Sequence, residues 1–197
     1  DLHALNFYSK HARSNLTDLG PGRYAIKAIT EKGSERVIRF AFQLANKRAG
    51  KRKVTLTSKY NMLSHSDGLF REIGQSISKE FPDVEFETFI IDDFLCRMIS
   101  DPHALDVVVM PNLYGDIITD QAGQIQGGVG TAGSANIGKR YAMFEAIHGS
   151  APRLIELGLE EYANPCSIIK AASLMLYHVG YLDVAEKINR ALDISTI

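Results

Sequence analysis

The chain lacks several features that would assign it to a specialised class of protein. It has only two cysteines, Cys96 and Cys166, both in apolar surroundings and without ligand-like spacing, which argues against a disulfide framework or a zinc site and favours a reducing compartment. No run reaches the roughly 18 consecutive apolar residues of a membrane span. The formal net charge is -1, so neither a nucleic acid nor a membrane is the expected partner.

A signal peptide is also lacking, but the sequence begins at Asp1 without a methionine. We therefore expect a preceding segment and attach little weight to that absence. With 197 residues, 45% of them hydrophobic, the chain is long enough for one domain or two small ones of ordinary globular composition.

Hydrophobic periodicity predicts alternating strands and helices, and hence an α/β architecture with helices on the faces of a sheet. Strands are expected over residues 23–29, 54–57, 84–91, 106–110 and 141–147. Helices are expected after a cap at Ser34 and over residues 66–81, 94–99, 116–126, 165–179 and 183–192. The glycine-rich residues 127–133 form the largest shift in composition, and we place a domain boundary near them.

Three carboxylates form a candidate metal site. Asp116 and Asp120 are four residues apart, so on a helix they project from one face, where their like charges repel unless a cation lies between them. Asp92 ends a predicted strand, and ligands of α/β sheets bind at the carboxyl ends of strands. Oxygen ligands in this number suit Mg²⁺ or Mn²⁺. Spacing alone leaves a second interpretation open, in which Asp116 only complements the helix dipole and Asp120 is a surface residue.

A lysine and a glycine-containing loop are further candidates. Lys59 follows a strand, and a nearby cation could lower its pKa and make it a base, although most such lysines are solvated loop residues. His148, Gly149 and Ser150 could present donors to a phosphate. A G-x-G-x-x-G fingerprint is absent, and residues 127–130 lack the Lys-Ser/Thr of a P-loop. On composition alone, a turn is the better interpretation of both glycine stretches.

Together these segments resemble the isocitrate/isopropylmalate (β-decarboxylating) dehydrogenase family, most of all its NAD-type isocitrate dehydrogenases. The resemblance runs in order through K-Y-N-M-L (residues 59–63), S-D-G-L-F (66–70), D-V-V-V-M-P-N-L-Y-G-D-I-I-T-D (106–120), G-G-V-G-T-A-G-S-A-N-I-G (127–138), F-E-A-I-H-G-S-A-P (144–152) and A-N-P (163–165). It implies the family's two-domain, non-Rossmann α/β fold, of which the chain holds only the C-terminal portion. Residues 1–126 would be the small dimerisation domain with its interlocking arm, on the substrate and metal side. Residues 127–197 would be the C-terminal part of the large cofactor-binding domain.

The resemblance also implies a chemistry: oxidation of a 2-hydroxy acid with hydride transfer to NAD (or NADP), followed by loss of CO₂ with the help of Mg²⁺ or Mn²⁺. Lys59 would be the catalytic base. The metal would be held by Asp92, Asp116 and Asp120, and the cofactor by His148, Gly149, Ser150, Ala151, Pro152, Arg153 and Asn164. Because Lys59 and Asp92 would serve the neighbouring subunit's site, a homodimer with shared active sites is implied. The expected location is the cytoplasm, or the mitochondrial matrix in a eukaryote.

Some residues depart from the family pattern. His3 stands where the family's catalytic tyrosine is expected, and the substrate-reading segment upstream is absent, so this chain alone should be inactive. Arg153 replaces the aspartate common in NAD-linked members and could pair with the 2′-phosphate of NADP. Ser58 and Tyr60 stand where histidine and alanine are common. Isocitrate is the expected substrate; 3-isopropylmalate, homoisocitrate or tartrate, and a non-catalytic regulatory subunit, are the alternatives.

Overall fold

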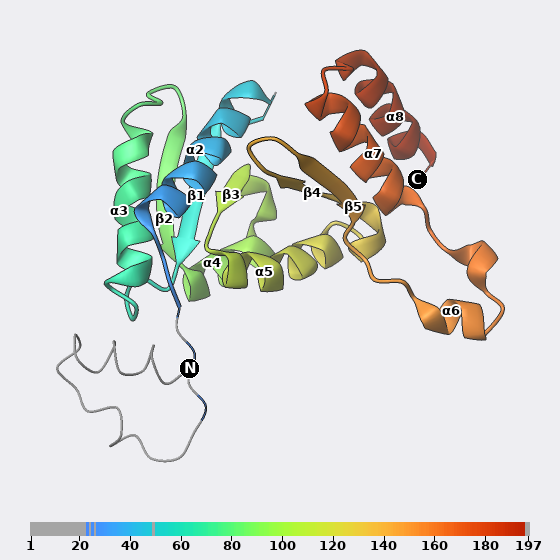
Figure 1. The fold of residues 1–197 in the computed structure, drawn as a ribbon, viewed down its shortest axis with the longest axis horizontal. Coiled ribbons are helices and arrows are strands. Elements are labelled where there is room, and N and C mark those ends of the chain that lie inside the picture. Colours follow the sequence, from blue (N-terminus) through green and yellow to red (C-terminus); the bar gives the residue numbers. More distant parts are fainter. Residues whose placement is uncertain (1–22, 24, 26, 49, 196–197) are drawn as a thin grey trace.

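The computed structural model describes residues 23, 25, 27–48 and 50–195. The region of the predicted interlocking arm before residue 23, including His3, lies outside the described residues. Two groups of elements lie side by side (Figure 1): a three-stranded sheet with its helices, and a β-hairpin with two long helices. No helix within the described ranges is both long and apolar enough to cross a membrane.

The main sheet has three parallel strands: β1 (Lys53–Ser58), β2 (Glu85–Ile90) and β3 (Val107–Val109). Their order is β2-β1-β3, with Val54 of β1 opposite Phe86 and Val107. The central strand is buried on both faces, as expected for a parallel sheet covered by helices. All three strands were predicted from their β-branched and apolar runs.

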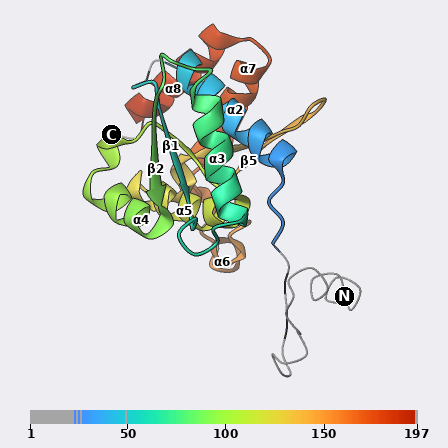
Figure 2. The same cartoon turned by 90° about the vertical axis from the view of Figure 1, so that its left-hand side faces the viewer.

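One face of this sheet is covered by α2 (Glu31–Lys47) and α3 (Ser66–Ser78), as Figure 2 shows. Ile38 and Phe42 of α2 and Phe70 of α3 pack there against Val54 and Leu56. The expected cap at Ser34 is wrong. Thr30 caps α2 instead, with its hydroxyl accepting a hydrogen bond from the Gly33 N–H at 3.2 Å, and Ser34 lies buried within the helix.

The expected strand over residues 23–29 is also wrong where the chain is described. Its described residues carry no regular structure and are not part of either sheet. The described residues 27–29 lead directly to Thr30, which caps α2.

The other face carries α4 (Ile91–Ser100) and α5 (Asn112–Ile125). Phe94 and Met98 of α4 pack there with Ile118 of α5. Both helices begin earlier than periodicity predicts, because α4 follows β2 without a loop and α5 starts directly after Pro111. Asp92 therefore lies in the first turn of a helix, and Asp116 lies in the second turn of α5 and not at its start.

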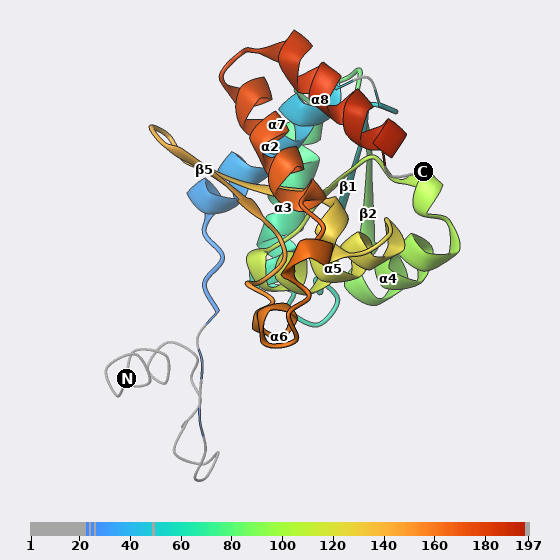
Figure 3. The same cartoon turned by 90° about the vertical axis from the view of Figure 1, so that its right-hand side faces the viewer.

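The second group is built on an antiparallel hairpin of β4 (Gly133–Ile137) and β5 (Ala142–Ala146). Helix α7 (Cys166–His178) packs on both strands, and α8 (Leu182–Ser195) packs on α7 (Figure 3). Strand β4 was not predicted, because its glycine-rich surroundings resemble a loop. The long connection between β5 and α7 contains the short α6 (Pro152–Glu156) and the 3₁₀ turn Glu160–Tyr162.

Close packing of β4 on α7 depends on Gly133. A Cβ at this position would lie 2.5 Å from the backbone nitrogen of Ala171 and 2.8 Å from its Cα. Backbone atoms in the middle of a helix cannot move aside as a side-chain end can. The glycine therefore sets the distance between the hairpin and α7.

We predict that Gly133→Ala lowers the free energy of unfolding by about 1–3 kcal/mol, the usual cost of overpacking. Gly68→Ala is the matched control, because its Cβ would meet nothing within 4 Å and alanine favours a helix by about 0.5 kcal/mol or more. Urea denaturation of the two variants measures the difference. Equal stabilities would contradict the packing account.

Candidate active and metal-binding site

The carboxyl edge of the parallel sheet holds Lys59, Asp92 and the start of helix α5. Lys59 directly follows β1, Asp92 lies in the first turn after β2, and α5 begins three residues after β3. Because all three strands run in the same direction, these chain reversals meet at one edge, where ligands of α/β sheets bind. Because β1 is the central strand, Lys59 at its end lies between the ends of β2 and β3.

Lys59 and Asp92 are brought together. The Lys59 ammonium, directly after β1, forms an ion pair with Asp92 Oδ2 in the first turn of α4. The Asp92 side chain is 64% exposed and that of Lys59 is 29% exposed. The pair therefore faces solvent and is accessible to a ligand.

Asp116 and Asp120 lie one turn apart on the exposed side of α5. Neither carboxylate has a hydrogen-bond or ion-pair partner among the described residues; the Thr119 hydroxyl donates to the backbone carbonyl of Asp116 and not to its carboxylate. Two unpaired carboxylates at this spacing form a donor set that suits a hard divalent cation. Within the part of the chain that the structure describes, no three acidic, histidine or cysteine side chains form a metal-binding group. One chain therefore offers two separate pairs, Lys59 with Asp92 and Asp116 with Asp120.

The structure adds a residue that sequence reasoning missed, the fully buried Asp67 in α3. Its Oδ2 accepts the backbone N–H of Lys59 at 2.9 Å and the hydroxyl of Tyr114 at 2.8 Å. Its Oδ1 forms an ion pair with Lys27. The S-D-G-L-F segment marks this position in the sequence, but nothing in the spacing indicates a buried carboxylate with three donors.

The surroundings of Asp67 shift two pKa values. For Lys27, burial acts to lower the pKa, but hydrogen bonds to Asp67 and Tyr114 outweigh it, and the net effect raises the pKa. Burial, and then the hydrogen bond to Asp67, raise the pKa of Tyr114. Both groups therefore hold their protons more tightly in the folded chain than in the unfolded one.

Ser58 and Tyr60 flank Lys59 and differ from the residues expected from the family resemblance. Each contacts a residue of helix α3. The guanidinium carbon of Arg71 lies 4.5 Å from the centre of the Tyr60 ring, a cation–π contact. The buried Ser58 donates a weak hydrogen bond to the Asp67 carbonyl at 3.5 Å. Both contacts join a residue next to Lys59 to helix α3.

The predicted cofactor residues lie on the connection between β5 and α7. His148, Gly149, Ser150, Ala151, Pro152, Arg153 and Asn164 are all exposed. Ala151 has a positive φ of 47°, which turns the chain into α6, and Arg153 lies in that helix. Asn164 Oδ1 accepts the N–H of Cys166 at 2.9 Å at the start of α7. The structure groups these residues on one connection but leaves their role a prediction.

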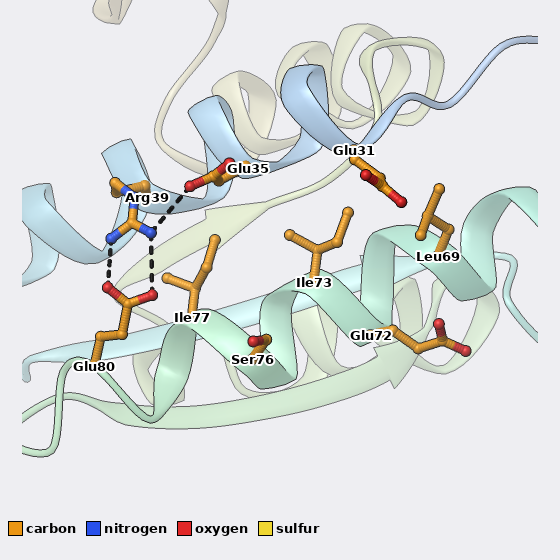
Figure 4. A pocket seen from close by; sticks show the side chains of 9 residues that line it. All are labelled: Glu31, Glu35, Arg39, Leu69, Glu72, Ile73, Ser76, Ile77 and Glu80. Carbon is orange, nitrogen blue, oxygen red and sulfur yellow. Dashed lines mark hydrogen bonds and ion pairs between the residues drawn. The ribbon is translucent and has the colours of Figure 1, made fainter.

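A groove between α2 and α3 contains none of the predicted site residues (Figure 4). Arg39 bridges it, with nitrogens 2.8 and 3.0 Å from the Glu80 carboxylate and 3.1 Å from Glu35. The hydrogen bond from Arg39 lowers the pKa of Glu80. Arg39 thus connects α2 with Glu80, which follows α3, and the groove is bridged at this end.

Residues 7–196 match the sequence profile of the family described as isocitrate/isopropylmalate dehydrogenase. The chain belongs to this family. This confirms the resemblance of the sequence motifs, and the α/β fold is that of the family's isocitrate dehydrogenases, of which the chain covers only part.

Individual family members agree with this assignment. The chain is 47% identical over 167 residues to isocitrate dehydrogenase [NADP] of Rickettsia felis, covering 85% of this chain and 34% of that protein. It is 40% identical over 170 residues to isocitrate dehydrogenase [NAD] subunit 2, mitochondrial, of Schizosaccharomyces pombe, covering 85% and 44%. The crystal structure of isocitrate dehydrogenase from Methylococcus capsulatus superposes with a TM-score of 0.79 at 47% identity, covering 85% of this chain and 48% of that one. The chain thus spans less than half the length of these family members.

The pKa shifts around Asp67 predict a loss of stability in alkali. Both pKa values exceed their ordinary values of 10.5 for Lys27 and 10.0 for Tyr114, so the stabilisation is complete below about pH 10 and decreases as the pH rises through the folded-state values. We expect the absorbance at 295 nm of the folded chain to show one tyrosine that ionises at a higher pH than an ordinary tyrosine. This step should be missing from the titration of Tyr114→Phe. A Tyr114→Phe titration identical to that of the unmodified chain would contradict the assignment.

Proposed function

We propose that the protein carrying this chain catalyses the metal-dependent oxidative decarboxylation of a 2-hydroxy acid, isocitrate, with hydride transfer to NAD(P). The observation that carries the proposal is the meeting, at one sheet edge, of the Lys59–Asp92 pair with the helix bearing Asp116 and Asp120. The chain spans 34% of one isocitrate dehydrogenase and 44% of another. The activity is therefore proposed for the whole protein, and this chain alone is expected to be inactive.

Lys59 would remove the proton of the substrate hydroxyl, directly or through a water. Its partly exposed side chain lies beside Asp92, one of the proposed metal ligands, and it would take up the hydroxyl proton as the neutral amine. Asp92, Asp116 and Asp120 would hold Mg²⁺ or Mn²⁺. When bound, the metal would polarise the substrate carbonyl and stabilise the negative charge left as CO₂ departs.

We further propose a homodimer in which each site takes residues from both subunits. The separation of the two pairs within one chain supports this, because neither pair alone supplies three metal ligands. Leu113 and Ile117 also support it: they flank the carboxylates on α5 and are each 61% exposed. Large apolar side chains beside a charged site are typical of a surface that a second subunit covers.

The cofactor would bind at the connection between β5 and α7 through His148, Gly149, Ser150, Ala151, Pro152, Arg153 and Asn164. NAD is the proposed cofactor on the resemblance of the surrounding motifs. NADP is the alternative, favoured by the Arg153 guanidinium, which could pair with a 2′-phosphate. Similar proteins carry both designations in their names.

Several finer assignments belong to the same proposal. Residues 1–126 would form the small dimerisation domain and residues 127–197 the C-terminal part of the cofactor-binding domain, in the cytoplasm or, in a eukaryote, the mitochondrial matrix. The family description also includes isopropylmalate dehydrogenases, so 3-isopropylmalate is the leading alternative substrate. A non-catalytic regulatory subunit is disfavoured, because the chain keeps Lys59 and all three candidate aspartates.

Lys59→Met in the full-length protein should lower kcat by about 100-fold or more, since general acid–base catalysis contributes about 100- to 10,000-fold. Substrate binding should change less, because the methionine keeps a side chain of similar length. Steady-state assays of NAD(P)H formation at 340 nm separate the two effects. A kcat within about twofold of wild type, well below that range, would refute the assignment of the base.

Asp116→Asn should abolish Mn²⁺-dependent turnover while leaving the dimer intact, since it removes one charge from the donor set without changing its shape. The matched control is Asp183→Asn, which changes another exposed helical aspartate in α8. Activity titrated with Mn²⁺, and light scattering for the dimer, make the comparison. Full activity of Asp116→Asn at the wild-type Mn²⁺ requirement would rule out a metal site at this helix.

A further inference from the structure

The buried carboxylate of Asp67 joins its own helix α3 to three other parts of the chain, those of Lys27, Lys59 and Tyr114. We propose that Asp67 is a positioning residue, which together with Tyr114 and Lys27 fixes the segment of Lys59 relative to helix α5. The inference rests on the proposed function only for what Lys59 does chemically. The positioning itself is a claim about geometry.

The Lys59 segment is closed by a ring of three hydrogen bonds. The Lys59 carbonyl accepts the N–H of Leu63 at 2.9 Å, and the Leu63 carbonyl accepts the N–H of Asp67 at 2.9 Å. Asp67 Oδ2 then accepts the N–H of Lys59, also at 2.9 Å. Met62 and Leu63 are 72% and 41% exposed, so the apolar packing of these two residues contributes little. The hydrogen bond from the Lys59 N–H to the Asp67 side chain therefore closes the ring formed by residues 59–67.

The same oxygen atom also holds α5. Tyr114 lies in the first turn of α5, two residues before Asp116, and its hydroxyl donates to Asp67 Oδ2 at 2.8 Å. A single atom thus accepts from the backbone of the residue proposed as base and from the helix proposed to carry metal ligands. A shift of one partner is transmitted to the other through two short bonds.

Lys27 makes this arrangement possible by compensating the charge. An unpaired carboxylate without exposure to water would be strongly disfavoured. The Lys27 ammonium pairs with Oδ1 and also donates to the Tyr114 hydroxyl at 3.2 Å. Oδ2 is consequently left for Lys59 and Tyr114. If Asp67 served stability alone, weakening one of these bonds would lower stability without altering Lys59.

The test uses Tyr114→Phe in the full-length protein, which removes one hydrogen bond to Oδ2 and keeps the Asp67–Lys27 ion pair. The control is Thr55→Val, which removes a 2.7 Å hydrogen bond to Glu87 from the buried middle of β1. Thermal melting checks that the two variants lose comparable stability. Acylation of Lys59 by acetic anhydride, quantified by mass spectrometry against the exposed Lys32, then reports how readily the Lys59 amine is released from its ion pair with Asp92, without any need for turnover.

We expect Tyr114→Phe to acylate several-fold faster at Lys59, because a loosened segment weakens the ion pair with Asp92, and Thr55→Val to match wild type. An unchanged rate in Tyr114→Phe, or an equal rise in Thr55→Val, would overturn the positioning role. In the same proteins, kcat should fall about tenfold or more only in Tyr114→Phe, at an unchanged KM, since a displacement of about 1 Å can cost on the order of 100-fold.

The two readouts separate the inference from the proposed function. If acylation changes in Tyr114→Phe and kcat does not, Asp67 positions Lys59 but Lys59 is not the base. If the wild-type protein shows no metal-dependent turnover at all, the proposed function fails, and the acylation rates alone decide whether the positioning role stands.

Discussion

The parallel pairing of β1 with both β2 and β3 is the constraint on which the rest of the structure depends. It buries the central strand on both faces, requires helices on each side of the sheet and brings three chain reversals to one edge. Lys59, the start of α4 and the start of α5 are neighbours because of this direction of pairing. An antiparallel neighbour would have carried its reversal to the opposite edge.

Two kinds of carboxylate in and beside helix α5 have opposite surroundings. Asp67 is fully buried. Its carboxylate forms an ion pair with Lys27 and accepts hydrogen bonds from Lys59 and Tyr114. Asp116 and Asp120 are exposed and unpaired among the described residues. A buried carboxylate of the first kind orders the structure, whereas carboxylates of the second kind remain available to a cation. The rigidity of the edge and its capacity for a ligand therefore come from different residues.

Periodicity and composition were sufficient for the parallel strands and most helices, because alternating burial and helical spacing are local signals. They missed β4, whose Gly-Ser-Ala-Asn-Ile sequence becomes a strand only by pairing with β5 and packing on α7. They also placed the starts of α4 and α5 too late. Family motifs supplied Lys59 and the aspartates as candidates, but the position of Asp67 among three donors arises from residues 40 and 47 positions away along the chain. Contacts between residues so far apart along the chain produce no periodic pattern in the sequence.

The central claim is that this sheet edge contributes to oxidative decarboxylation of a 2-hydroxy acid. The most direct test incubates the full-length protein with isocitrate, NAD or NADP, and Mn²⁺, and measures NAD(P)H and released CO₂ in the same sample. The account predicts that both form in equal amounts and that neither forms once the metal is chelated. NAD(P)H without CO₂, or equal turnover of both products in the presence of excess chelator, would contradict it.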